Sequence, residues 1–361
     1  MSTPRRTGAP DADGPADPEV VALVEHFLDT AAVTHDRDVL RGIVQAVLEL
    51  ARGDASRLDL KLARAALGEM AEAFQMFAPY RDVRKVTVFG SARTQPSDRT
   101  YELARELAAR FAAAGWMVVT GAGPGIMAAG NEGAGEAMAI GVNILLPGEA
   151  EPNEWIAENS KLVEMKYFFT RKLMLIKESS GFLVLPGGFG TLDESFELLT
   201  LLQTGKAEPE PLVLVDSPDE RYWRGWEDFV TAQVYSRGFA DPVEAALYRI
   251  TDDLDEAVRE ILGFHRNYHS RRFVRDAMVI RLRYAPTDLE LASLSATFAD
   301  ICSARGIWRT GPYPVERADR DHLELARVAL EFNRVHHGRL RQLIDALNAL
   351  SPPGAATPAR S

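Results

Sequence analysis

Residues 181–204 decide the fold, and they read GFLVLPGGFGTLDESFELLTLLQT. The stretch begins with a short apolar run, Gly181–Leu185, whose length suits a buried strand. It turns at Pro186–Gly190 and continues over Leu192–Thr204 with the apolar spacing of a helix. A strand, a glycine turn and a helix in direct succession predict one βα unit of an α/β domain.

The same succession repeats on both sides of this stretch. Upstream, we expect strands at Lys85–Ser91, Trp116–Thr120 and Gly141–Leu146, alternating with helices at Tyr101–Ala114, Ile126–Met138 and Tyr167–Lys177. Downstream, Pro211–Asp216 has the pattern of one more strand. Strands that alternate with helices of this length predict an α/β fold with a Rossmann-like parallel sheet flanked by helices.

Helical sequence precedes this unit, and a mixed segment follows it. Apolar residues at helical spacing over Pro18–Arg52 and Arg57–Ala78 predict an N-terminal helical extension of two or three helices. Downstream, we expect helices at Tyr222–Tyr235 and Asp253–Gly263, then a C-terminal αβ appendage with a strand at Ala277–Leu282 and helices at Thr287–Arg305 and Asp319–Leu350. The expected division is a disordered leader (1–17), the helical extension (18–80), the Rossmann-like domain (81–263), the appendage (264–350) and a disordered tail (351–361).

The composition is that of an ordinary globular protein, with 46% hydrophobic and 26% charged residues. The net charge of −11 disfavours nucleic acid and anionic membranes as partners, because the long-range field repels phosphate polymers. The apolar runs fall far short of the roughly 20 residues that span a bilayer, and the N-terminus lacks the apolar core of a secretory signal. A single cysteine, Cys302, excludes an internal disulfide and an all-cysteine metal site. We expect a cytoplasmic protein.

Two glycine loops follow expected strands: Gly121–Gly125 (GAGPG) and Gly187–Thr191 (GGFGT). Open parallel sheets bind ligands at this edge, and glycines before a helix N-terminus let a phosphate approach backbone N–H groups. The first loop differs from a dinucleotide fingerprint, because its third glycine comes one position early and no acidic residue follows about 20 positions on. A Gly-Lys-Ser/Thr phosphate loop is absent from the sequence. The loops therefore predict a site for a small phosphorylated ligand.

At this point the sequence resembles a known family. Pro186–Glu194 (PGGFGTLDE) resembles the P-G-G-x-G-T-x-x-E motif of the LOG family, whose members are often mislabelled lysine decarboxylases. The Arg171-Lys172 pair stands on the preceding expected helix, as it does in that family. The first glycine loop with Ile126-Met127, and the turn at Phe89–Arg93, resemble the two remaining family blocks. The resemblance covers about Arg84–Asp216 and is to the longer bacterial members.

The resemblance implies a phosphoribohydrolase, which cleaves a nucleoside 5′-monophosphate such as AMP or a cytokinin ribotide into free base and ribose 5-phosphate. It implies no metal and no organic cofactor. It implies Arg171 and Glu194 as the catalytic pair. It further implies that the substrate is held by Ser91, Gly123, Gly125, Lys172, Gly187, Gly188, Gly190 and Thr191. The alternative is a protein that binds a phosphorylated cofactor, such as molybdenum cofactor, without cleaving it, as structural relatives of the family do.

The residue types of the domain agree with carboxylate chemistry. Hydrolysis of an N-glycosidic bond passes through an oxocarbenium-like cation, and a carboxylate stabilises that cation or activates water. No histidine lies between His35 and His265, so histidine-based catalysis lacks its residue there. Two structural alternatives stay open: Thr191 and Glu194 have the spacing of a helix capping box, and the Arg171-Lys172 pair has the charge of a solvated helix face.

Three further groups carry weaker expectations. Asn131 and Glu132 either contact the ribose or face solvent. The basic cluster between His265 and Arg275 either binds a phosphorylated effector or pairs with acidic residues of the chain. The helix within Phe196–Leu202 is apolar nearly all round and needs burial on two sides. One side is expected to meet the sheet, and the other a second subunit in a homodimer or higher homo-oligomer, or else the helices of Pro18–Ala78.

Overall fold

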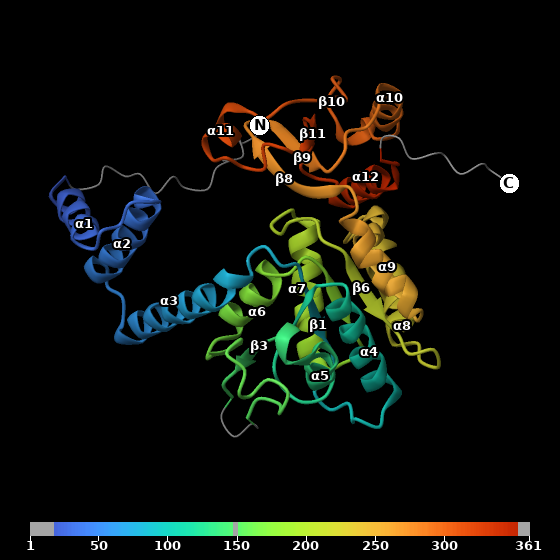
Figure 1. Cartoon of the computed structure of the whole chain (residues 1–361), viewed down its shortest axis with the longest axis horizontal. Coiled ribbons are helices and arrows are strands. Elements are labelled where there is room, and N and C mark those ends of the chain that lie inside the picture. Colours follow the sequence, from blue (N-terminus) through green and yellow to red (C-terminus); the bar gives the residue numbers. More distant parts are fainter. Residues whose placement is uncertain (1–17, 147–150, 353–361) are drawn as a thin grey trace. The chain divides into compact units, whose positions relative to one another are not determined.

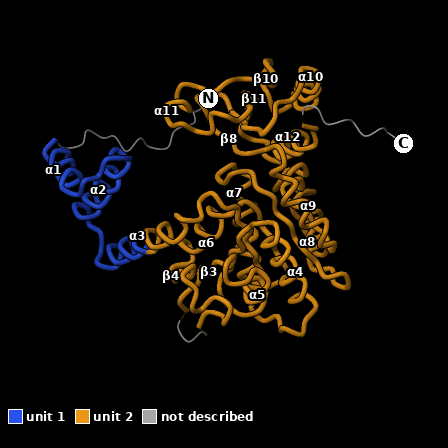
Figure 2. The backbone as a smooth tube through the Cα atoms, viewed as in Figure 1, with its two compact units in different colours: residues 1–68 blue, residues 69–361 orange. Residues whose placement is uncertain are grey.

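The computed structural model describes residues 18–146 and 151–352. The expected disordered leader lies outside the described residues, as does the expected tail from residue 353 onward. The chain divides into two compact units, residues 1–68 and residues 69–361 (Figure 2). The boundary between them falls within helix α3 (Arg57–Phe77).

Unit 1 contains α1 (Pro18–Thr30), α2 (Arg37–Arg52) and the first half of α3. Glu25 of α1 pairs with two arginines of α2, at 2.6 Å from Arg37 and 2.5 Å from Arg41. The expectation of helices in this region is confirmed. Large apolar side chains of α1 and α2 remain exposed: Leu23, Phe27, Val39, Ile43, Val47 and Leu50.

Unit 2 is built on a parallel sheet of seven strands in the order β4-β3-β2-β1-β5-β6-β7 (Figure 1). Its strands are β1 (Lys85–Phe89), β2 (Met117–Thr120), β3 (Ala139–Ile144), β4 (Leu162–Met165), β5 (Phe182–Val184), β6 (Leu212–Val215) and β7 (Arg249–Thr251). Every pairing in this sheet is parallel. The strand order reverses between β1 and β5, which is the position where open α/β sheets bind ligands. The expected α/β fold is confirmed.

Helices cover both faces of the sheet, because the strands are apolar on both. On one face, Val86, Val118 and Leu183 pack with α4 (Arg99–Ala113), α5 (Ile126–Met138) and α9 (Leu254–Phe264). On the other face, Val119, Val184 and Leu214 pack with α6 (Phe168–Lys177), α7 (Phe189–Gln203), α8 (Tyr222–Val230) and the end of α3. The loops at the strand ends therefore stand on a rigid three-layer support.

The sheet departs from expectation at both edges. Strands β4 and β7 fall outside the expected strands, because runs of four and three residues are too short to show a period. Strand β3 begins at Ala139, before the expected Gly141. Helix α7 begins at Phe189, inside the expected turn Pro186–Gly190.

The appendage is an antiparallel sheet in the order β10-β11-β9-β8. Its strands are β8 (Tyr268–Val274), β9 (Ala277–Leu282), β10 (Ile307–Arg309) and β11 (Ala326–Leu330), and its helices are α10 (Asp288–Thr297), α11 (Pro314–Ala318) and α12 (His337–Ala349). Residues of α10 and α12 share one buried core with this sheet. The expected C-terminal αβ appendage is confirmed in kind.

Two expected helices of the appendage are correct only over part of their length. Asp319–Leu350 is interrupted by β11, which pairs with both β9 and β10, and only its last part is helical. The reason lies in the tertiary structure. The sequence pattern places Arg327 on a solvated helix, but its side chain is fully buried in β11 and pairs with buried Glu316 at 3.3 Å. Thr287–Arg305 is helical only to Thr297, and a 3-10 turn follows at Ala299–Ile301.

Other segments of the same chain cover part of the second apolar side of helix α7. Leu198 and Leu202 are buried in the core beneath the sheet. The turn η3 (Pro242–Leu247) and helix α12 also contact α7, and Gln203 donates to Glu244 at 2.7 Å. This cover comes from segments other than those expected, and Phe196 remains 45% exposed. In the described ranges, no helix has the length and apolar character needed to cross a bilayer.

Candidate functional site

Three loops meet at the carboxyl edge of the sheet, after β1, β2 and β5. The Ser91 N–H donates to the carbonyl oxygen of Pro186 at 3.1 Å, and the Ser91 carbonyl accepts from Ile126 N–H at 3.0 Å. Because β1 lies between β2 and β5, the turn after β1 joins the two glycine loops. Ser91 is thus the backbone link between them, and its hydroxyl accepts from Arg93 N–H at 3.1 Å.

Glycine is needed at different positions of the two loops for different physical reasons. Gly125 has φ +66°, and a Cβ there would lie 2.3 Å from the Ser91 carbonyl oxygen, so no other residue fits. A Cβ on Gly187 would lie 2.2 Å from Thr191 Oγ1, and one on Gly123 would lie 2.7 Å from Met127 Cε. A Cβ on Gly188 or Gly190 would meet no atom within 4 Å. These last two glycines border open space.

Helix α7 begins at this edge without a side-chain cap. Its N-cap is Gly188, which makes no side-chain cap hydrogen bond. Thr191 is therefore not an N-cap, and the capping-box alternative for Thr191 and Glu194 is wrong. The first N–H groups of a helix lack intrahelical acceptors and lie at its positive end. The amides of Phe189, Gly190 and Thr191 have this position, which suits a phosphate.

Arg171 of α6 and Glu194 of α7 form a buried pair beside this helix start. Arg171 Nη1 lies 3.4 Å from Glu194 Oε1, with the side chains 8% and 13% exposed. The same guanidinium donates from Nε to the Val142 carbonyl at 2.9 Å and from Nη2 to the Gly121 carbonyl at 3.3 Å. Arg171 is therefore a buried clamp between β3, the first glycine loop and α7, not part of a solvated face.

Burial dominates the electrostatics of this pair. It raises the pKa of Glu194 to about 7, although the charge of Arg171 acts in the opposite direction. Burial also lowers the pKa of Arg171, but a guanidinium keeps its charge through such a shift. A carboxyl group that titrates near neutral pH beside a fixed cation is suited to general acid–base work.

Lys172 points to a different set of partners from its neighbour. Its Nζ lies 2.6 Å from Glu197 and 3.1 Å from Asp193, and its side chain is 16% exposed. The two carboxylates raise the pKa of Lys172 against the effect of burial. Lys172 thus pairs on α7 beside the site, while Arg171 reaches Glu194.

Three residues that sequence reasoning left out or left open support the loops. The Tyr222 hydroxyl of α8 donates to the Gly187 carbonyl at 2.7 Å. Asn153 Nδ2 donates to the carbonyls of Ala122 and Gly123, at 2.9 and 3.0 Å. Asn131 is fully buried and accepts from Thr120 and Asn153, so the solvent-facing alternative is wrong for it. No sequence motif links Tyr222 or Asn153 to these loops.

Glu132 and two arginines of the 265–275 cluster have contacts away from the glycine loops. Glu132 accepts from the Tyr101 hydroxyl at 2.8 Å and pairs with Arg105 at 3.2 Å, so it faces α4. Basic residues of the 265–275 cluster pair with acidic ones: Arg271 with Glu208, and Arg272 with Asp319 and Asp321. Among the described residues, no group of three or more His, Cys, Asp or Glu side chains is arranged to hold a metal ion.

Comparison with known proteins places the chain in one family. A family model described as "Possible lysine decarboxylase" matches residues 124–261. The "Probable cytokinin riboside 5′-monophosphate phosphoribohydrolase" of Oryza sativa subsp. japonica is 30% identical over 190 residues, which are 49% of this chain and 77% of that protein. The cytokinin riboside 5′-monophosphate phosphoribohydrolase of Mycobacterium tuberculosis is 27% identical over 168 residues, covering 44% and 83%.

Solved structures share the fold at low identity. The molybdenum cofactor carrier protein of Chlamydomonas reinhardtii is 22% identical, with a TM-score of 0.36, and the match covers 50% of this chain and 99% of that one.

Proposed function

The chain belongs to the LOG, or lysine-decarboxylase-like, family, and from this premise we propose that it hydrolyses the N-glycosidic bond of a nucleoside 5′-monophosphate. The products are free base and ribose 5-phosphate, and the substrate is AMP or a related ribotide such as that of a cytokinin. The observation that carries the proposal is the buried Arg171–Glu194 pair beside the start of α7.

The phosphate end of the substrate fits the glycine-lined start of α7. The amides of Phe189, Gly190 and Thr191 are available to phosphate oxygens, and Gly188 and Gly190 leave room for close approach. Ser91 and Gly125 lie next to each other beside this loop, since the Ser91 N–H donates to the Pro186 carbonyl and a Cβ on Gly125 would meet the Ser91 carbonyl oxygen. A phosphate held there orients the ribose, so that binding energy is used to align the C1′–N bond.

The chemistry falls to Glu194. As the C1′–N bond breaks, its electron pair leaves with the base, and positive charge develops on the ribosyl ring. Ionised Glu194 stabilises that charge, or takes a proton from the water whose oxygen then bonds to C1′. The departing base nitrogen takes up one proton, so that one water is added overall. Arg171 holds the carboxylate in place by its fixed charge.

The test is to incubate the purified chain with a panel of nucleoside monophosphates and to separate free base by chromatography. We expect AMP or a related monophosphate to release base and ribose 5-phosphate, and adenosine to react poorly because it lacks the phosphate handle. Equal turnover of adenosine and AMP would contradict the proposal. Tight binding of a phosphorylated ligand with no base release would favour a carrier instead.

A further inference from the structure

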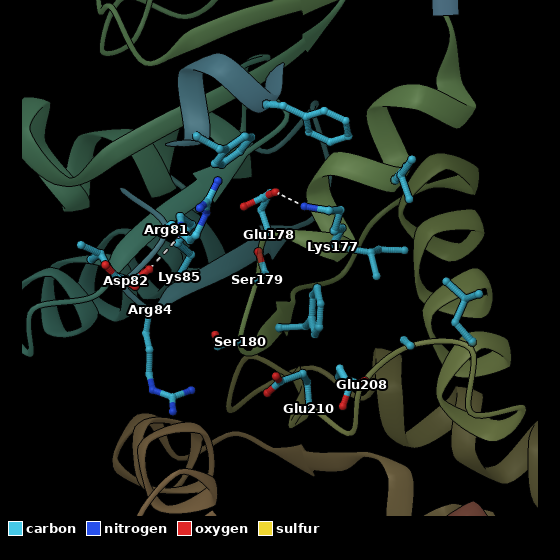
Figure 3. A pocket seen from close by; sticks show the side chains of 18 of the residues that line it. Arg81, Asp82, Arg84, Lys85, Lys177, Glu178, Ser179, Ser180, Glu208 and Glu210 are labelled. Atoms are coloured by element: carbon cyan, nitrogen blue, oxygen red, sulfur yellow. Dashed lines mark hydrogen bonds and ion pairs between the residues drawn. The ribbon is translucent and has the colours of Figure 1, made fainter. Parts of the chain in front are cut away.

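A large cavity lies at the edge of the sheet opposite the glycine loops (Figure 3). Its volume is about 1360 Å³. It is lined by the residues just before β1 (Arg81–Lys85), before β5 (Glu178–Ser180) and before β6 (Lys206, Glu208 and Glu210). The five residues of β1 separate this edge from the glycine loops by about 16 Å. We call it the N-edge cavity, and it is distinct from the candidate active site.

One wall of the N-edge cavity is apolar. Phe77 and Phe182 form its buried part, with exposed fractions of 2% and 1%. Phe74, Phe169 and Leu173 line the same cavity and remain 44%, 51% and 43% exposed. A concave site lined by large apolar side chains is typical of a binding site. Aromatic side chains in particular favour a ligand that carries a flat ring.

The other walls are charged, and most carboxylates there already have partners. Five carboxylates and six Lys or Arg residues line the cavity. Glu178 pairs with Lys177 at 2.5 Å, as Figure 3 shows. Two more carboxylates pair with cations outside the lining, Glu197 with Lys172 and Glu208 with Arg271. Glu210 lies 3.2 Å from His265 Nε2, which also lies 2.7 Å from the Ser180 carbonyl oxygen. Among the described residues, Asp82 at the exposed rim and Glu210 are the two carboxylates of the lining that form no ion pair with a Lys or Arg, against five such cations.

The cations of the lining, by contrast, are mostly unpaired. Of the six, Lys177 alone forms an ion pair with a carboxylate of the described residues. The remaining five have none there: Arg81, Arg84, Lys85, Lys206 and Arg283. The uncompensated charge of the N-edge cavity is therefore positive, although the whole chain has a net charge of −11.

Neutral partners fix some of these cations in position. Lys85 donates to the carbonyls of Tyr80 and Val83 at 2.7 and 2.9 Å, so it serves the backbone at a helix end. Arg84 Nη1 lies 2.7 Å from His265 Nδ1, and Arg283 Nε donates to the His265 carbonyl at 3.3 Å. Each of these two guanidinium groups keeps further N–H groups for an anion. Because these side chains are already held in place, binding an anion costs them less conformational entropy.

Two histidines also line the N-edge cavity. The rings of His269 and His322 both line the cavity, with centroids 4.3 Å apart. Burial lowers the pKa of His269 to about 4, and the positive charges of His322, Arg84 and Arg283 act in the same direction. The five cations of the lining that have no ion pair in the described residues favour an anion.

We propose that the N-edge cavity is a second small-molecule site, which takes a phosphorylated, ring-bearing ligand of the nucleotide class. The ring lies against the apolar wall, and the phosphate faces the unpaired cations. This site goes beyond the proposed reaction, because none of the residues assigned to that reaction lines it. Phe169 and Leu173 lie on α6, the helix that carries Arg171, so a ligand here contacts an element of the candidate active site.

The test is calorimetric titration of the full chain with ADP, GDP and UDP. The cavity variant is Arg81→Glu with Lys206→Glu, since both residues are exposed and form no ion pair in the described structure. The matched control is Lys61→Glu with Arg64→Glu, two exposed positions of α3 in unit 1 that change the net charge equally. Adenosine and pyrophosphate serve as half-ligands.

We expect at least one nucleoside diphosphate to bind the wild-type chain and the control alike, and the cavity variant to lose about tenfold or more in affinity at one site. Both half-ligands bind more weakly. The Arg81→Gln, Lys206→Gln variant gives an intermediate loss and repeats the test if the Glu variant fails to fold. Identical isotherms for the cavity and control variants, including no binding in either, would overturn the proposal. Failure of the proposed reaction would appear separately, as absence of base release from AMP by the wild-type chain.

Discussion

Glu194 is the residue on which the proposed chemistry depends, and Glu194→Gln removes its charge while keeping its shape. We expect turnover of AMP to fall by about two orders of magnitude or more. The pKa of Glu194 in the folded protein, about 7, lies above the ordinary value of 4.5, so ionisation of this carboxyl destabilises the fold. The destabilisation is complete above pH 7 and absent below pH 4.5. Glutamine carries no such cost, and the melting temperature at pH 8 should stay the same or rise.

The control for that variant is Asp193→Asn, an adjacent exposed carboxylate that pairs with Lys172. It should keep most of the activity. Near-normal turnover in Glu194→Gln would contradict a catalytic role for Glu194.

The raised pKa of Glu194 also predicts the pH dependence of the reaction. Because the proposed reaction uses the ionised form of Glu194, kcat/KM should rise from pH 6 to pH 8 with a midpoint near 7. Arg171 lowers the pKa of Glu194, so Arg171→Gln should move the rising limb to higher pH. Initial rates over this range, with a second buffer series at each pH, measure both. A profile that falls over the same interval would show that the protonated acid is the active form.

Tyr222 has a testable effect on the phosphate loop. Its hydroxyl holds the Gly187 carbonyl, and in a trans peptide the N–H of Gly188 then points the opposite way. Tyr222→Phe frees this peptide to rotate, so KM for AMP should rise several-fold with little change in kcat. Tyr235→Phe, which removes a hydroxyl 3.5 Å from that of Tyr248, is the matched control. An equal KM in both variants would count against this role.

At the residue scale, the sequence predicted the two ends of the candidate site but not its scaffold. Arg171 and Glu194 stand in motifs, so the family resemblance alone implies their roles. Tyr222 and Asn153 reach the glycine loops from about 35 and 30 positions away in the chain, with no motif. Contacts of that kind depend on where the fold brings two segments, which local pattern does not encode.

At the scale of elements, long periodic segments were predictable and short or buried-polar ones were not. Helices α4, α5 and α6 and strands β1 and β2 lie where the apolar spacing predicts them. Strand β11 was missed because Arg327 resembles a surface residue, while its actual surroundings are a buried carboxylate and two neighbouring strands. Pairing between distant strands overrode the local helical pattern there.

The two glycine loops should respond differently to alanine. Gly125→Ala forces φ +66° on a residue with a Cβ and brings that Cβ against the Ser91 carbonyl, so the melting temperature should fall by several degrees. Gly190→Ala meets no atom within 4 Å and lies in the first turn of α7, so the unliganded protein should keep its stability. Its KM for AMP should nevertheless rise, because the methyl group occupies space that the phosphate needs. Unchanged KM in Gly190→Ala would move the phosphate away from this turn.

At the scale of the whole molecule, an exposed apolar surface on α6 and α7 predicts self-association. Phe168 is 52% exposed and Phe196 is 45% exposed, although buried residues of both helices pack in the core beside the sheet. A two-fold homodimer is the commonest closed assembly for such a surface. Light scattering at micromolar concentration should give at least twice 39.8 kDa. Phe168→Asp should weaken the assembly, and Leu289→Asp, at an 82% exposed position of α10, should not. A monomer that still hydrolyses AMP would contradict the dimer.

The pairing of β1 with β5 has a consequence for how the chain is made. Val88 lies beside Leu183, 95 positions later, so the centre of the sheet closes only after that much further synthesis. At roughly 5–20 residues per second, a growing chain spends several seconds with β1 bare along one edge. Glu194 leaves the ribosome later still. An unfinished chain therefore lacks the Arg171–Glu194 pair, and the proposed hydrolysis can begin only once the sheet has closed.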